Sequence, residues 1–119
     1  MTIRQNLAVL AASLMAIFSS QALAHVSITA SSIEDGATLS QAPEELTFSF
    51  GGDVRLVALT VSGPGMEDED LSFQPDDGFA ADYEAALPAL GTGSFEIEWR
   101  AMAKDGHVML GTIAFDIEG

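Results

Sequence analysis

The sequence contains no cysteine among its 119 residues. Disulfides therefore do not stabilise the protein, and zinc, iron–sulfur and blue-copper sites built on thiolates are excluded. Basic residues are also scarce, because four Lys and Arg stand against 18 Asp and Glu, with a formal net charge of −14. Nucleic acids and anionic lipids are bound through basic patches, so neither is an expected partner of this chain.

The chain also lacks an apolar run long enough to span a membrane. The run from about Leu7 to Phe18 is roughly a dozen residues, whereas a spanning helix needs about 20. It follows Arg4 and precedes Ala22-Leu23-Ala24, which is the order of a secretory signal peptide with a small-x-small cleavage site. We therefore predict a signal peptide over residues 1–24 and one exported domain over residues 25–119, with no membrane insertion of that domain. An uncleaved anchor is the alternative.

Helical periodicity is missing from residues 25–119, where apolar residues alternate with a period of two. Expected strands cover residues 26–30, 46–50, 56–61, 95–101 and 113–117, with weaker ones over 70–74 and 82–86. Turn residues separate them at 34–36, 51–53, 62–65, 75–78, 91–93 and 105–106. About seven short strands at this spacing predict an all-β, Ig-like fold, either a Greek-key barrel or a sandwich.

The large apolar residues of these strands are the candidate core. They are Phe48, Phe50, Phe95, Trp99 and Phe115. Trp99 lining a ligand site is the alternative for that residue. The acidic run over residues 65–70 predicts an exposed charged loop, because the spacing of a calcium-binding loop is absent.

Only two histidines are present, His25 and His107. Cleavage after Ala24 would place His25 at the amino terminus, where the α-amino group has a pKa of about 8 and a metal can displace its proton. The amine and imidazole Nδ1 would then chelate one ion. His107 follows Asp105-Gly106, a pair that favours a two-residue hairpin turn. If the terminus lies near this turn, His25, Asp105 and His107 supply three nitrogens and one oxygen.

That donor set suits the tetragonal geometry of Cu(II), although a tetrahedral zinc site remains open at this point. The common amino-terminal copper motif needs histidine at the third position of the mature chain. Ser27 occupies that position, so this motif is excluded. The alternative interpretation of His107 is a surface side chain that follows an ordinary turn.

The mature chain resembles the CopC family of periplasmic copper-binding proteins over nearly its whole length. The matching segments are His25, Asp35-Gly36-Ala37-Thr38-Leu39, residues 42–50, Trp99 to His107, and Gly111-Thr112-Ile113-Ala114-Phe115. The resemblance implies a seven-stranded Greek-key β-barrel with one Cu(II) held by His25, Asp105 and His107. It also implies a role in copper sequestration, homeostasis or resistance, or in delivery to an inner-membrane copper transporter. We further expect a monomer that is not an enzyme.

The chain departs from the family pattern at several positions. Ile33 and Val108 stand where many relatives have proline, which shapes loops and supplies no ligand. A methionine-rich stretch is absent, and only Met66, Met102 and Met109 remain after residue 24. We therefore expect no dedicated Cu(I) site, because thioether sulfur is the ligand that Cu(I) selects. Met109 is either a core residue or a neighbour of the copper.

Two other classes of function remain open from the sequence. Two histidines with a terminal amine also form the histidine brace of copper-dependent oxidative enzymes, although Asp105 would fill a coordination position that such enzymes keep open. The other class is a metal-free β-sandwich that serves as an interaction module. No nucleophile–histidine arrangement or phosphate-binding glycine loop is present, so catalysis is not expected.

Overall fold

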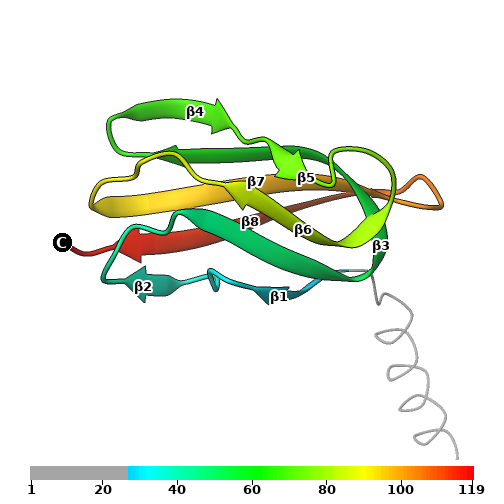
Figure 1. Ribbon diagram of the computed structural model, residues 1–119, viewed down its shortest axis with the longest axis horizontal. Coiled ribbons are helices and arrows are strands. Elements are labelled where there is room, and N and C mark those ends of the chain that lie inside the picture. The colour runs from blue at the N-terminus through cyan, green and yellow to red at the C-terminus, as the bar shows by residue number, and fades with distance from the viewer. Residues whose placement is uncertain (1–26) are drawn as a thin grey trace, which may run out of the picture.

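The computed structural model describes residues 27–119, and these residues form an all-β structure (Figure 1). The strands are β1 (Ile28–Ser31), β2 (Ala37–Leu39), β3 (Glu45–Gly63), β4 (Met66–Asp70), β5 (Phe73–Gln74), β6 (Ala80–Ala86), β7 (Gly93–Ala103) and β8 (Val108–Ile117). The all-β prediction is confirmed. In this part of the chain there is no helix that could cross a membrane. The predicted signal peptide over residues 1–24 and His25 lie outside the described residues.

Strand β3 belongs to both layers of the fold. Its first half pairs with β1 and β6, and its second half, from Val54 onward, pairs with β7 and β4. The sheet therefore curls into one layer in the order β1-β3-β6-β5 and a second in the order β2-β8-β7-β3-β4. Figure 1 shows β3 bending sharply between the two layers.

The bend in β3 corrects the sequence interpretation of residues 51–53. They were predicted to be a turn between two strands, whereas the structure continues one strand through them. The register with β6 nevertheless shifts between Ser49 and Val54, and the pairing with β7 begins at Val54. Gly51 suits this corner because a Cβ there would come within 3.3 Å of Thr29 Cγ2 on β1. Glycine therefore lets β1 approach β3 closely.

The acidic run over residues 65–70 was predicted to be a loop, and this is also wrong. Residues Met66–Asp70 form β4, which is antiparallel to β3. Gly65, with φ of +72°, provides the tight turn between the two strands. The four acidic side chains of β4 are exposed, so hydrogen bonding to β3 outweighs their low strand propensity without burying charge.

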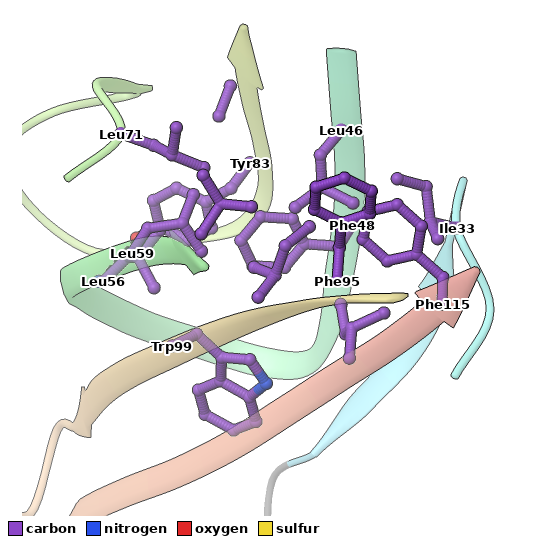
Figure 2. Packing of buried hydrophobic residues seen from close by; sticks show 14 of the residues in the cluster. Ile33, Leu46, Phe48, Leu56, Leu59, Leu71, Tyr83, Phe95, Trp99 and Phe115 are labelled. Atoms are coloured by element: carbon purple, nitrogen blue, oxygen red, sulfur yellow. Dashed lines mark hydrogen bonds between the residues drawn. The ribbon is translucent and has the colours of Figure 1, made fainter. Parts of the chain in front are cut away.

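The core lies between the two layers and contains every aromatic residue predicted for it. Phe48, Phe50, Phe95, Trp99 and Phe115 are all buried. Phe95 stacks on Phe115 with ring centroids 5.7 Å apart, and Phe50 meets Trp99 edge-on at 5.1 Å. Figure 2 shows Phe95 and Phe115 beside Ile33, and the Trp99 indole beside β8. Trp99 is therefore a core residue.

Two features hold the core near the β3 corner. The Tyr83 hydroxyl donates to Val54 O at 2.6 Å and accepts from Leu56 N–H at 3.2 Å, which satisfies main-chain groups next to the register break. On the other side, the Trp99 indole covers Gly111 so closely that a Cβ at residue 111 would overlap the ring. The first contact joins β6 to the β3 corner, and the second packs β7 against β8 below the turn that connects them.

Candidate metal centre

The turn between β7 and β8 carries the two candidate ligands that the structure describes. Ala103 O accepts the Gly106 N–H at 2.9 Å, and Ala103 N–H donates to His107 O at 2.8 Å. Gly106 has φ of +92°, so the connection is a three-residue loop with glycine in the left-handed region. The predicted two-residue turn is therefore wrong in length. Gly106 has a positive φ directly after the tight turn, and a residue with a side chain would adopt this conformation only with strain.

Asp105 and His107 lie together across this glycine. Asp105 Oδ1 accepts the His107 main-chain N–H at 3.0 Å, and Asp105 Oδ2 lies 2.8 Å from His107 Nδ1. These contacts lower the pKa of Asp105, first through the His107 main-chain N–H and then through the His107 ring. The carboxylate is therefore ionised at neutral pH, as a metal ligand or a partner of one must be.

The pairing leaves His107 with one nitrogen available for a metal. When Nδ1–H donates to the carboxylate, Nε2 carries the free lone pair. A carboxylate has about four lone-pair positions, so Asp105 can orient the ring and still offer an oxygen to the same ion. The side chains of His107 and Asp105 are 82% and 64% exposed, so an ion reaches both from solvent.

The first described residue of the chain lies at the same corner as this turn. Ser27 O accepts the Gly51 N–H at 2.9 Å, and Val54, three residues further along β3, pairs with Ala103 at the start of the turn. Three residues of strand span about 10 Å. Figure 1 shows the β3 bend and the β7–β8 turn at one end of the molecule and the carboxyl terminus at the other.

Sequence reasoning missed one neighbour of the turn. Asp53 Oδ2 lies 3.7 Å from Lys104 Nζ, and this ion pair joins the β3 corner to the loop. The Gly-Gly pair within a long alternating stretch was the available signal, because it marks a corner rather than a strand end. Met109, the other open residue, is half-buried and packs against the core beside Ala101.

The structure thus brings Asp105 and His107 together, whereas His25 lies outside the described residues. Within residues 27–119, no group of three His, Asp or Glu side chains is close enough to hold a metal ion, and this applies equally to the acidic strand β4. These residues define a small β-sandwich that presents an exposed Asp–His pair at one end.

Residues 28–118 match the CopC domain model, and the chain belongs to the CopC family. Among solved structures, it is similar to CopC from Methylosinus trichosporium OB3b, with 20% identity, a TM-score of 0.65, and coverage of 79% of this chain and 94% of that one. Two structures of PcoC from Escherichia coli are also similar. Selenomethionine PcoC, a copper resistance protein, has 21% identity, a TM-score of 0.54, and coverage of 77% and 99%.

The other PcoC structure, described as a methionine-rich copper resistance protein, has 23% identity, a TM-score of 0.51, and coverage of 80% and 100%. At these identities the similarity establishes the fold, which agrees with the curled all-β sheet described above. No curated protein matches the sequence.

Proposed function

We propose that this protein binds one Cu(II) ion per chain as cargo, in the periplasm, through His25, Asp105 and His107. The observation that carries the proposal is the Asp105–His107 pair, which orients a histidine ring at an exposed turn. Membership of the CopC family and the similarity to copper resistance proteins support copper as the ion.

The third ligand residue is supported by the position of Ser27. His25 is two residues before Ser27, whose carbonyl oxygen is bonded to the β3 corner. Two residues of extended chain span at most about 7 Å. Because Val54 of that corner pairs with Ala103, we expect the amino terminus of a chain cut after Ala24 to lie near the turn. The terminal amine and the ring of His25 would complete a set of three nitrogens and one oxygen, which favours Cu(II).

The biological role that follows is sequestration and hand-over of copper rather than catalysis. The acidic surface keeps cations near the protein, and an exposed site allows the ion to enter and leave. The role includes copper homeostasis or resistance, with delivery to an inner-membrane copper transporter as its most specific form. We expect the copper-loaded protein to produce no hydrogen peroxide with a reductant beyond that of free copper, which distinguishes it from a histidine-brace enzyme.

A one-residue extension of the amino terminus tests the proposal most selectively. Adding a single glycine with an acetylated amine before His25 keeps every side chain and converts the His25 amine to an amide. Cu(II) affinity should fall by more than about 100-fold, because even partners that only support a ligand are worth about 10–100-fold. Isothermal calorimetry with a competing chelator measures the loss.

The matched control is a glycine added after Gly119, at the opposite end of the molecule in Figure 1. This protein should bind Cu(II) as the unextended protein does. Equal affinity of the two extended proteins would eliminate the terminal amine as a ligand.

A further inference from the structure

One edge of β8 has main-chain groups without a partner strand. On the side of β8 away from β7, β2 pairs only with Phe115–Ile117, and Ala114 bonds to Asp35 Oδ1 and to Gly36 N–H. No strand among residues 27–119 pairs with the remaining stretch, residues 108–112, on that side. An unpaired edge of this kind is a template for another strand.

The hydrogen-bond alternation identifies which residues of that edge are available. In an antiparallel ladder, residues that bond to the neighbouring strand alternate with residues whose N–H and C=O point away. The bond between Ala103 and His107 sets the phase, so Met109 and Gly111 bond to β7. Val108, Leu110 and Thr112 therefore present N–H and C=O outward, as Ala114, in the same phase, does toward Asp35 and Gly36.

The side chains along this edge are uncharged, and most of them are apolar. Leu110 is 70% exposed and Val108 is 58% exposed, the two highest values among the exposed large hydrophobic residues of residues 27–119. Natural proteins commonly protect free edges with charge or proline. The edge strand β4 follows this rule with its four acidic residues, whereas residues 108–112 contain no charge.

The nearby charges indicate what would bind here. Arg100 lies directly opposite Leu110 on β7 and is exposed. The other two basic side chains of the described chain are already paired, Arg55 with Asp77 at 2.9 Å and Lys104 with Asp53 at 3.7 Å. Arg100 has no ion-pair partner among residues 27–119, so a carboxylate is the complementary group opposite Leu110, whereas the exposed Glu98 lies opposite Thr112 and would repel a carboxylate there.

We propose that residues 108–112 bind an extended segment of another protein as an added antiparallel strand, with a carboxylate of that segment opposite Leu110. Such a carboxylate would lie two strand spacings from Arg100, about 10 Å between Cα atoms, which the two side chains span together. Main-chain bonds at three positions supply affinity, and apolar residues beside Val108 and the carboxylate supply selectivity.

A second copy of this chain fits the edge less well. A symmetric pair that uses all three outward positions is centred on Leu110 and aligns Arg100 of each copy with Arg100 of the other, about 14 Å apart, with no carboxylate between them. Val108 directly follows His107, so a bound segment would lie beside the metal site. That last point alone rests on the proposed function, because the edge exists without copper.

The test is a titration of metal-free, ¹⁵N-labelled protein, produced from the full-length sequence, with a blocked peptide of sequence Thr-Val-Thr-Glu-Thr-Val-Thr. In ¹H–¹⁵N NMR spectra we expect saturable changes in the amide chemical shifts, centred on residues 108–112. A peptide with lysine in place of glutamate should bind at least about threefold more weakly at about 0.15 M salt, because it loses the pair with Arg100 while the long-range attraction of the acidic protein for a cation is screened.

Two variants separate the edge from general stickiness. Leu110→Pro removes an outward N–H that β7 does not use, and it should abolish the shifts. Leu110→Glu keeps the N–H and places a negative charge against the peptide glutamate, so it should weaken binding even if the proline variant does not fold. Phe79→Ala removes another exposed apolar side chain, and binding should be unchanged.

Shifts that are absent or scattered over the surface would overturn the proposal. Sedimentation as a dimer without peptide, with the same amides affected by dilution, would assign the edge to a second copy and overturn it as well. Because copper is absent from the titration, failure here leaves the proposed function intact, and loss of copper binding leaves this result intact.

Discussion

At one end of the β7–β8 hairpin, Phe95 stacks on Phe115 inside the core, whereas at the other end Asp105 and His107 are exposed to solvent. The first end is specified by packing, since a Cβ at Gly63 would overlap the Phe95 ring. The second end is specified by four hydrogen bonds and one glycine conformation. The β7–β8 hairpin is therefore stabilised by its buried part, whereas its candidate metal ligands lie on the exposed turn.

The largest expected effect comes from the contact between the two parts. Gly111→Ala places a methyl group against the buried Trp99 indole, and it should destabilise the protein by about 2–3 kcal/mol through overpacking. Urea unfolding followed by Trp99 fluorescence measures the change.

The matched control is Gly91→Ala, because a Cβ at Gly91 would meet no atom within 4 Å. That variant should unfold within about 0.5 kcal/mol of the wild type. A normal unfolding midpoint for Gly111→Ala would show that the packing of Trp99 does not constrain the hairpin.

A smaller effect, confined to the exposed end, is expected from Asp105→Asn. The amide cannot supply an anionic oxygen and holds Nδ1–H less strongly, so Cu(II) affinity should fall by about 10–100-fold. Because both side chains are exposed, the unfolding midpoint should fall only slightly. Affinity by chelator competition and stability by urea unfolding are both required, and a parallel loss of both would contradict a division between the two ends.

The smallest effect is expected from Asp77, which is also exposed. The hydrogen bond from Arg55 lowers the pKa of Asp77, with the Gly78 N–H contributing next. A lowered pKa in the folded state adds stability above the unfolded value, near 3.9, and that stability is lost as pH falls through the folded pKa. Asp77→Asn should therefore have a slightly lower unfolding midpoint than wild type at pH 7, and the two should converge once the pH falls below the lowered folded-state pKa of Asp77. A difference that grows on acidification would contradict this sign.

The alternation of apolar residues was sufficient to predict the all-β class and the aromatic core, because burial on one face requires a period of two. It failed at Gly51 and Gly52, where one strand turns a corner and the pattern resembles two strands with a turn. It failed again at β4, whose exposed acidic residues have no alternation and are held by main-chain bonds to β3.

The candidate site was predictable in part for a related reason. Asp-Gly-His within a short connection signals a turn, and the structure places Asp105 against His107 as that spacing allows. The loop length and the role of the Asp105 carboxylate in orienting the ring depend on the Gly106 conformation, which the sequence does not encode separately. The Asp53–Lys104 ion pair depends on the corner in β3. Because the sequence analysis placed a turn between two strands there, it could not predict this pair.

Electron paramagnetic resonance of the protein cut after Ala24, with one equivalent of Cu(II), tests the central claim most directly. The account predicts a single tetragonal Cu(II) species whose hyperfine structure reports three nitrogen donors. A spectrum of hydrated Cu(II), or a mixture of species with fewer nitrogens, would contradict it.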